Sequence, residues 1–551
     1  MPTSQPWLKI YDELGIKSPG KVSRTMASFL EDHAKNSPDA DALHYCGKSF
    51  SYAAYNGEAN KLANALRDEG VRKGDVVGLH MPNIPQYVIA LAAISKLGAI
   101  GTGISPILAP GEVLAQIKDA NVKVVLSFSE LTPVTIAIKD IPTGLKAVII
   151  CGPRDYLDAP QVELPEFIGP ASIRFTDLMD GQSDQFQSEP VDPESIFMIQ
   201  YTGGTTGPPK GAMLSHRSLV TNAFQASATH EALLERPIVL GSAFPLFHVA
   251  GLTNAITTCI YRGLYHLIPD PRNVSHYCEM MKLVPPTHIV AVPALYEMWM
   301  ANPAFKEIDF SQLKVAHTGA APVTQSTLSA LNTIIGEYKI ADGFGMTEAG
   351  PTHVVHPNMR YKKGSVGLPV AGADMRIVDL ETGLKTMPVG EPGEIITSGP
   401  HLMSGYLGQP EATAKALREL DGEIWMYTGD VGYVDDEGYL FLCDRAKDML
   451  IVGGYKVFSV EVEDKLCAMP EIASCAIIGT PDEKRPGNDV VNLYVELAQN
   501  FQNDPDVKNR IVAFCRGNMA AYKIPKAIHL IDEIPLTAVG KIDKKVLRKA
   551  V

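Results

Sequence analysis

Continuous apolar runs alternate with helix-like segments over the first 200 residues of the chain. The apolar runs at residues 75–81, 122–128 and 146–152 predict buried strands, and the segment 85–98 predicts a helix. Continuous apolar strands separated by helices are typical of a parallel sheet that is covered on both faces. The pattern therefore predicts repeated βα units and an α/β fold class.

The pattern changes further along the chain. Apolar runs at 287–293 and 313–319 predict a second α/β unit, and short alternating segments over 374–407 predict a small β-barrel-like region. After Asp444 the helix candidate VEVEDKLCAM and the strand candidates CAIIGT and NLYVEL predict a compact α+β domain. A lysine-rich run such as residues 541–549 is by default a solvated surface segment.

Length, composition and charge limit the classes of protein that fit. A chain of 551 residues, 46% hydrophobic and 20% charged, suggests a soluble globular enzyme with roughly three to four folding units. The formal net charge of −13 argues against a nucleic-acid-binding surface, which would be basic. Anionic substrates must therefore meet locally arranged donors.

Targeting and cysteine motifs point to a cytoplasmic, reducing location. The eight cysteines form no CxxC pair, so the sequence suggests neither a zinc site nor a redox dithiol. The start has no basic region followed by an apolar run, and the apolar stretch 87–104 contains Lys96 and three glycines. We expect neither a signal peptide nor a spanning helix; peripheral membrane contact and a homodimer stay open.

The strongest chemical signal is the stretch YTGGTTGPPKG at residues 201–211. Glycines let backbone N–H groups approach an anion, threonines add hydroxyl donors, and lysine supplies a compact positive charge. Pro208 and Pro209 precede the lysine, which excludes a Walker A loop and argues against an ordinary P-loop NTPase. A plain glycine-rich turn stays open here. The candidate phosphate-binding residues are Thr202, Gly203, Gly204, Thr205, Thr206, Gly207 and Lys210.

The position of this stretch also favours phosphate binding. It follows the strand candidate 195–200 and precedes the segment 211–224, so we expect it to join a strand to a later helix. Open α/β sheets usually bind phosphates at such connections.

Four further motifs follow in order: GFGMTE at 343–348, YTGD at 427–430, DRAKDMLIVGGYKV at 444–457 and PLTAVGKI at 535–542. With them, essentially the whole chain resembles the acyl- and aryl-CoA synthetases of the adenylate-forming superfamily, which also includes luciferases and peptide-synthetase adenylation domains. The resemblance implies a two-step reaction with ATP, Mg²⁺ and CoA. A carboxylate attacks the α-phosphate of ATP and expels pyrophosphate, and the thiol of CoA then attacks the acyl-adenylate and releases AMP.

The resemblance implies phosphate and metal roles for three residues. Lys210 would hold the β- and γ-phosphates, Thr347 would contact the α-phosphate, and Glu348 would coordinate Mg²⁺, which prefers hard oxygen ligands. Taken alone, a Thr-Glu pair is more often a helix cap with a favourable first-turn acid.

Nucleoside contacts are implied for the next group of residues. Phe344 occupies a position where the family often has tyrosine, and its ring would lie against adenine. Asp430 would accept hydrogen bonds from both ribose hydroxyls, and Arg445 would contact the nucleotide nearby. A turn aspartate and a surface ion pair are the ordinary alternatives for these two residues. The adenine-side candidates are Asp342, Gly343 and Phe344.

The C-terminal motifs imply a moving domain. Lys541 would bridge the attacking carboxylate and the α-phosphate during adenylation, and Lys447 would be the hinge about which the small domain rotates between the two steps. We therefore predict an ATP- and acyl-binding domain of residues 1–446 and a mobile catalytic domain of residues 447–551.

Residues on the CoA side are less distinctive. Gly453 and Gly454 would face the pantetheine passage, although a simple glycine turn is the alternative. His248 resembles the family histidine near the acyl pocket and the thiol entrance, but a lone histidine among apolar residues is more often part of the core. The sequence identifies no residue as the base for the CoA thiol.

The acyl side predicts an uncharged substrate. Gly319, Ala320 and Pro322 would line the nucleotide and acyl sites, and the opening PWLKIYDELGI resembles the start of fatty-acyl-CoA ligases. We predict a medium- or long-chain fatty acid, with an aromatic or alicyclic acid as the close alternative. The further pocket candidates are Val249, Thr253, Ala321 and Met346.

Other functions stay open at this point. A nucleotide hydrolase, a non-catalytic nucleotide sensor, a luciferase-like oxygenase and a carrier-protein acylase would each keep part of the motif set. CoA-dependent release of AMP separates the acid-thiol ligase from all of them.

Overall fold

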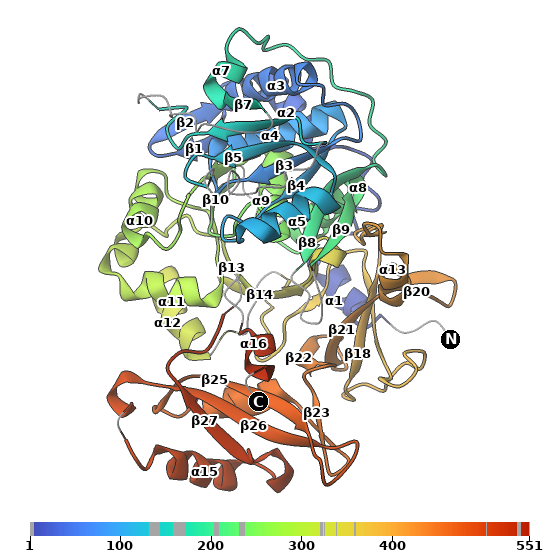
Figure 1. Cartoon of the computed structure of the whole chain (residues 1–551), viewed down its shortest axis with the longest axis vertical. Helices are drawn as coiled ribbons and strands as arrows, with labels where there is room; N and C mark the ends of the chain where they lie inside the picture. Colours follow the sequence, from blue (N-terminus) through green and yellow to red (C-terminus); the bar gives the residue numbers. More distant parts are fainter. Residues whose placement is uncertain are drawn as a thin grey trace.

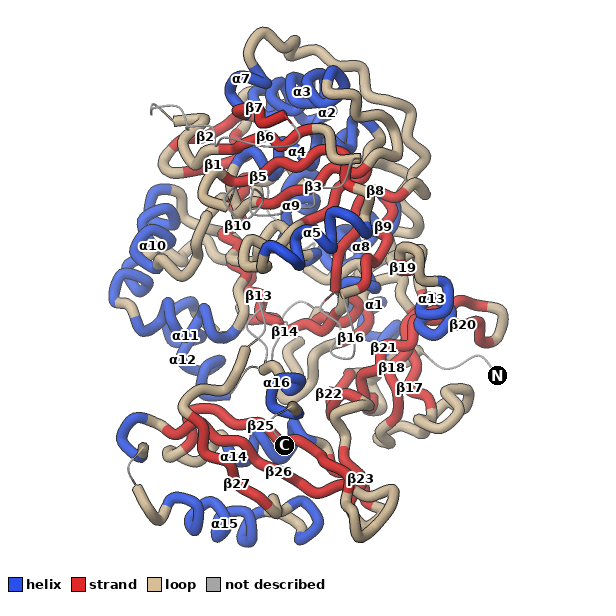
Figure 2. The backbone as a smooth tube through the Cα atoms, in the orientation of Figure 1, coloured by secondary structure: helices blue, strands red, loops and turns tan. Residues whose placement is uncertain are grey.

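The computed structural model arranges the chain as two large sheets with helices, an antiparallel sheet beside them, and a small sheet at the opposite end (Figure 1). Figure 2 shows the strands of the small sheet well separated from those of the eight-stranded sheet. The structure describes residues 5–131, 144–157, 171–202, 209–230, 237–319, 323, 325–337, 339–357, 360–502, 504–536 and 542–549.

The predicted βα units form an eight-stranded sheet, parallel from β8 to β7 and antiparallel at the β8–β9 and β9–β19 pairs. In sheet order its strands are β19 (Gly405–Tyr406), β9 (Lys210–Ser215), β8 (Ile196–Thr202), β4 (Ile100–Gly103), β3 (Val76–His80), β5 (Val122–Phe128), β6 (Ala147–Cys151) and β7 (Ala171–Arg174). The helices of this region are α2 (Met26–Asn36), α3 (Tyr52–Asp68), α4 (Pro85–Leu97), α5 (Pro110–Asp119) and α7 (Phe175–Met179).

Helix α4 shows how the apolar pattern places an element. Every one of its residues is buried, as expected from a nearly uncharged segment. Pro85 occupies the first turn, where its missing N–H costs nothing, and Gly98 ends the helix in the left-handed conformation. The strands predicted at 75–81, 122–128 and 146–152 are β3, β5 and β6.

The second α/β unit forms a nine-stranded sheet. In sheet order its strands are β16 (Leu368–Pro369), β15 (Thr352–Val355), β14 (Ile340–Gly345), β13 (Val315–Gly319), β12 (His288–Val290), β10 (Val239–Ser242), β11 (Leu264–His266), β1 (Asp41–Tyr45) and β2 (Lys48–Ser51). The helices are α8 (His216–Ala228), α9 (Val249–Ile260), α10 (Val274–Leu283), α11 (Pro293–Ala301), η2 (Pro303–Glu307), α12 (Gln325–Ile335) and η3 (Thr347–Ala349). β1 and β2 therefore join a sheet whose other strands begin about 190 residues later.

The predicted β-rich region is an antiparallel five-stranded sheet. Its core includes Trp7, Ile10 and Tyr11 of the first helix, which pack with Met375 and Leu440. The first helix thus contacts a region that is synthesised much later. The elements are α1 (Trp7–Leu14), β17 (Asp374–Val378), β18 (Gly393–Ser398), α13 (Pro410–Ala416), β20 (Leu417–Leu420), β21 (Glu423–Val434) and β22 (Leu440–Arg445).

The C-terminal part has an apolar core of its own, which runs from Leu450 to Cys515. Its three-stranded sheet has the order β25-β26-β27. The division of the chain at residues 446 and 447 stays a prediction. The elements are β23 (Leu450–Val452), β24 (Tyr455–Val457), α14 (Ser459–Leu466), β25 (Ile472–Pro481), β26 (Asp489–Leu497), η4 (Gln499–Phe501), α15 (Val507–Asn518), η5 (Ala521–Lys523), β27 (Ala527–Ile531) and α16 (Lys544–Arg548).

The structure corrects two expectations about local environment. The phosphate-loop stretch joins two antiparallel strands, β8 and β9, and helix α8 begins only after β9, because residues 210–215 continue the sheet. The lysine-rich end is not simply solvated: Lys544 forms a 2.8 Å ion pair with Glu463, and Arg548 pairs with Asp448.

Candidate functional site

The phosphate-loop stretch lies in a β-hairpin near the edge of the eight-stranded sheet. β8 ends at Thr202 and β9 begins at Lys210, and these two residues are partners in the antiparallel register. The Thr202 hydroxyl is also 3.5 Å from the Lys210 carbonyl, to which it donates. The two ends of the loop are therefore held against each other.

Several predicted residues cannot be placed. The structure leaves undescribed the phosphate-loop residues Gly203, Gly204, Thr205, Thr206 and Gly207, together with Ala320, Ala321, Pro322 and Lys541. Their roles stay predictions from the sequence.

Lys210 and Glu348 are connected through a tyrosine. The ammonium of Lys210 lies 4.9 Å from the centroid of the Tyr406 ring, and the Tyr406 hydroxyl donates to Oε1 of Glu348 over 2.7 Å. Glu348 is only 7% exposed. Burial, and then the adjacent Glu348 carboxylate, raise the pKa of Tyr406, so the phenol keeps its proton and remains a donor.

The ends of β13 and β14 bring the adenine-side candidates together. Gly319 and Gly343 are partners in the parallel register, so both strands end on the same edge. Burial raises the pKa of Asp342 to about 7, and a 2.8 Å hydrogen bond from the Gly343 amide partly opposes that rise. Gly345 has no room for a side chain, because a Cβ there would lie 1.9 Å from the carbonyl oxygen of Pro351.

Phe344 and Thr347 complete this edge. The Phe344 ring lies 4.6 Å from the ring of His353 and packs against the core cluster that contains Trp7. Thr347 begins the one-turn helix η3, which follows β14 directly. Stacking of Phe344 on adenine stays a prediction.

Asp430 and Arg445 face each other across β21 and β22. They are register partners, and Arg445 Nε lies 3.1 Å from Asp430 Oδ1. The Asp430 side chain is 10% exposed and the Arg445 side chain 45%, so the pair sits at the boundary between protein and solvent. Lys447 follows two residues later and is exposed. The contact therefore adjoins the predicted hinge.

His248 has a local structural task. It precedes α9, and its Nδ1 accepts a 3.3 Å hydrogen bond from the amide of Ala250. Val249 and Thr253 on the first turns of the same helix are buried. Met346 packs against the core cluster that contains Val249. The described acyl-pocket candidates are thus uncharged and surrounded by apolar residues.

Gly453 and Gly454 form the turn of the β23–β24 hairpin. Both have positive φ, 62° and 83°, and Val452 and Tyr455 pair on either side of them. A two-residue turn with positive φ at both positions favours glycine for backbone reasons alone. A role beside pantetheine stays a prediction.

Tyr406 and an ionic cluster in the C-terminal part were missed from the sequence. Lys544 lies 2.8 Å from Glu463 and donates to Ser459 Oγ over 2.6 Å, while the Ser459 amide donates to Asp444. Tyr406 contacts residues 58 and 196 positions away, so no local motif could reveal its partners. The flanking Gly405 and the alternation of GYL are the only sequence signals of a strand there.

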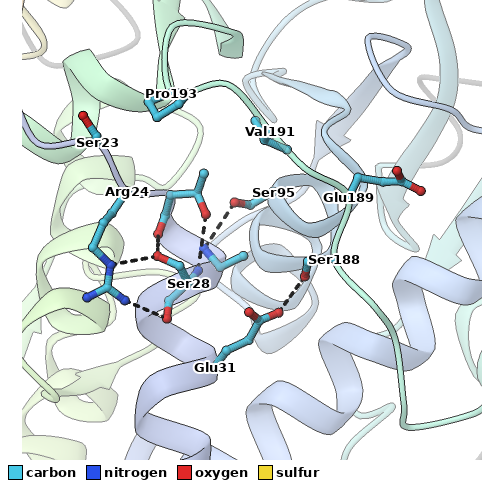
Figure 3. Close-up of a pocket in the computed structure, with 11 residues that line it drawn as sticks. Ser23, Arg24, Ser28, Glu31, Ser95, Ser188, Glu189, Val191 and Pro193 are labelled. Carbon is cyan, nitrogen blue, oxygen red and sulfur yellow. Dashed lines mark hydrogen bonds between the residues drawn. The ribbon is translucent and has the colours of Figure 1, made fainter.

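A separate hollow of about 320 Å³ lies where α2 and α4 meet the segment 188–193 (Figure 3). Two of its charged side chains contact neighbours: Glu31 accepts from Lys96 and from Ser188, each over 2.6 Å. Arg24 donates to Ser28 over 3.1 Å. These residues come from other elements than the candidate site, and we assign the hollow no ligand.

Within the described ranges, no group of three or more His, Cys, Asp or Glu side chains is placed to hold a metal ion. Mg²⁺ does not require such a cage, because it is usually bound by one or two carboxylates together with substrate phosphates. Nor does any helix within those ranges combine the length and apolar character needed to cross a membrane.

Most of the chain matches known proteins. The family model described as AMP-binding enzyme matches residues 30–407, and the AMP-binding enzyme C-terminal domain matches residues 461–541. The long-chain-fatty-acid–CoA ligase of Bacillus subtilis strain 168 is 33% identical, over 98% of this chain and 97% of that protein. The feruloyl-CoA synthase of an Amycolatopsis species is also 33% identical, over 95% and 98%.

Solved structures give the same result. The anthranilate CoA ligase AuaEII with anthranoyl-AMP is 27% identical with a TM-score of 0.84, covering 96% of this chain and 97% of that one. ATP-bound MatB from Rhodopseudomonas palustris is 27% identical with a TM-score of 0.83, covering 96% and 99%. The predicted fold class and the family resemblance are both confirmed.

Proposed function

The chain belongs to the family of AMP-binding enzymes and is an adenylate-forming acyl-CoA ligase, and on this premise we propose that its acid substrate is a medium- or long-chain fatty acid. The observation that carries the proposal is the similarity to long-chain-fatty-acid–CoA ligases along nearly the whole chain. The uncharged helix α9 supports it, because apolar lining suits an aliphatic chain.

In the adenylation step the site must bring two anions together. We propose that Lys210 and the loop hold the β- and γ-phosphates, so that pyrophosphate leaves a neutralised environment. Thr347 would donate to the α-phosphate. The Glu348 carboxylate fits as a hard oxygen ligand, and bound Mg²⁺ would neutralise phosphate charge.

Both steps would take place in the same site. In the first, a carboxylate oxygen bonds to the α-phosphorus as the bond to the pyrophosphate oxygen breaks. The CoA sulfur, as the thiolate after the thiol proton has left to solvent, then bonds to the acyl carbon as AMP leaves. Asp430 and Arg445 would hold the ribose through both steps, whereas Lys541 would act in the first and withdraw by rotation about Lys447.

An aromatic acid is the second candidate. The similarity to a feruloyl-CoA synthase, at the same 33% identity as the Bacillus fatty-acid ligase, favours it. Phe244 and Phe247 beside His248 are partly buried and would offer rings to a planar acid.

Substrate class is tested by CoA-dependent AMP release from purified full-length protein over a panel of saturated fatty acids of increasing chain length, ferulate, anthranilate and an alicyclic acid. We expect the highest kcat/KM with a medium- or long-chain fatty acid. A preference for ferulate or anthranilate would replace this proposal with the aromatic one. The Lys210→Ala variant is the control for AMP release by a contaminant, and Lys61→Ala on α3 is its matched surface control.

A further inference from the structure

We propose that Tyr406 is a positioning residue that holds the Glu348 carboxylate and the Lys210 ammonium in fixed relation to each other. Its hydroxyl contacts Glu348 and its ring contacts Lys210. The inference rests on the proposed roles of Glu348 toward Mg²⁺ and of Lys210 toward phosphate. It adds a third residue that contacts both and that no motif of the family resemblance contained.

The backbone around Tyr406 is attached to the strand that begins with Lys210. β19 pairs with β9, with Tyr406 opposite Ala212. The amide of Leu407 donates to the carbonyl of Gly211 over 2.8 Å. This pairing therefore holds Tyr406 beside the strand that begins with Lys210, so that its ring can contact the Lys210 ammonium.

The same short segment also holds Glu348. The amide of Met403 donates to the backbone carbonyl of Glu348 over 2.9 Å, in addition to the side-chain bond from Tyr406. Residues 403–407 thus act as a strap between β9 and η3. A second helix fixes the strap from outside, because the Tyr406 amide donates to Thr413 Oγ1 over 2.9 Å.

The chemistry of the contacts explains why a tyrosine is suited to this place. A buried carboxylate is costly unless donors satisfy it, and a hydrogen bond to a charged group is stronger than one between neutral groups. The phenol donates to one oxygen, which restricts the orientation of the carboxylate for a ligand at the other. The ring face attracts the lysine ammonium.

Two substitutions separate the hydroxyl from the ring. Tyr406→Phe removes the bond to Glu348 and keeps a ring beside Lys210, whereas Tyr406→Leu removes both. Tyr55→Phe is the matched control, because that buried hydroxyl also donates one hydrogen bond, over 2.9 Å to the Val88 carbonyl, on a helix that contributes no site residue.

The direct readout is Mn²⁺ affinity measured by electron paramagnetic resonance with ATP present, which needs no turnover. We expect Tyr406→Phe to weaken Mn²⁺ binding about tenfold or more, in line with the loss of one charge-assisted hydrogen bond. Tyr406→Leu should weaken it as much and should also raise the dissociation constant of ATP several-fold. Tyr55→Phe should match the wild type in both.

A second readout covers the chemistry. In ATP–pyrophosphate exchange with the best acid, Tyr406→Phe should raise the half-saturating Mg²⁺ concentration about tenfold and recover most of its rate at saturating Mg²⁺. A loss that saturating Mg²⁺ does not restore, or Mn²⁺ affinity within twofold of the wild type, would overturn the positioning role. Melting temperatures of the two Phe variants should fall by similar amounts.

The outcomes also distinguish this inference from the proposed function. If no acid supports AMP release, the substrate proposal fails, while Mn²⁺ titration with ATP still measures the effect of Tyr406. If Glu348→Gln leaves Mn²⁺ affinity unchanged, Glu348 is not a metal ligand and the positioning role of Tyr406 falls with it.

Discussion

The phosphate side of the site, at β9, η3 and β19, holds the buried residues Glu348 and Tyr406, whereas the side that leads into the C-terminal part is half-exposed. Glu348 is 7% exposed and bound through both its side chain and its backbone. Arg445 is 45% exposed at the side chain, and Gly453 and Gly454 form an open turn. The predicted site is therefore assembled from a buried wall and a more exposed one.

This difference fits a reaction with two unlike steps. The α-phosphate would stay bound from ATP through to AMP, so preorganised donors on the buried wall would lower the cost of both steps. We propose that the C-terminal side changes between the two attacks, because Lys541 would act only in the first. Four substitutions would sharpen or break this comparison.

The largest effect is expected for Lys541→Ala. Loss of a cation that neutralises the attacking carboxylate and the α-phosphate should slow adenylation about 10²–10³-fold. Thioester formation from supplied acyl-adenylate should change less than about threefold. Pyrophosphate exchange and single-turnover thioester formation measure the two steps. An equal loss in both would mean that Lys541, on the C-terminal side, does not act in adenylation alone.

Gly345→Ala tests the packing of β14, the strand that leads into η3 on the phosphate side. An alanine Cβ would clash with the Pro351 carbonyl at 1.9 Å, and neither backbone can withdraw easily. We expect the free energy of unfolding to fall by about 3 kcal/mol or more, measured by urea denaturation. Gly57→Ala in α3 is the control, because its nearest contact is an ordinary 3.8 Å and the effect should be small. A tolerated Gly345→Ala would show that this wall can adjust.

Asp342→Asn tests the same strand, β14, through the pH dependence of its contribution to stability. The folded-state pKa, about 7, lies above the ordinary 3.8, so between these values the folded chain binds a proton that the unfolded chain has lost. Wild-type stability should therefore fall as pH rises from about 4 to about 7 and remain lower above that. The variant should be more stable than the wild type at pH 8 by roughly 1–2 kcal/mol, and the difference should vanish near pH 4. A constant difference across that range would assign the effect to packing.

Gly453→Ala should have the smallest effect on stability. A left-handed φ costs a non-glycine residue about 1–2 kcal/mol, and no atom lies within 4 Å of the added Cβ. Gly487→Ala, also at positive φ and in open space, is the matched control. If Gly453 borders the pantetheine passage, only Gly453→Ala should lower kcat/KM for CoA, with adenylation unchanged. Identical kinetics for the two variants would reduce Gly453 to a turn residue.

Much of the fold was predictable because it follows periodicity. The apolar runs that became β3, β5, β6 and β12 are short and continuous, and buried parallel strands require that pattern. The hairpin β8–β9 was not predictable in the same way. Residues 210–215 and the start of α8 form one stretch of apolar and polar residues without a clear period. The strand β9 exists there because β8 and β19 both pair with it.

The site was predictable only where a motif carried it. Thr347, Glu348 and Asp430 stand in recognisable strings, but Tyr406 acts through contacts that a local string does not encode. The lysine-rich end shows the opposite error. Its charges indicated a solvated surface, whereas Glu463 and Asp448 from distant segments pair with Lys544 and Arg548.

Two early elements of the chain, α1 and β1, pack or pair with segments that are synthesised much later. The strand β1 pairs with β11, Leu43 opposite Tyr265, and Trp7 packs in one cluster with Leu440. At typical rates of synthesis, residue 440 leaves the ribosome roughly 20 to 90 seconds after residue 7. The apolar side chains of α1 therefore cannot pack against Leu440 until the middle of the chain has been made.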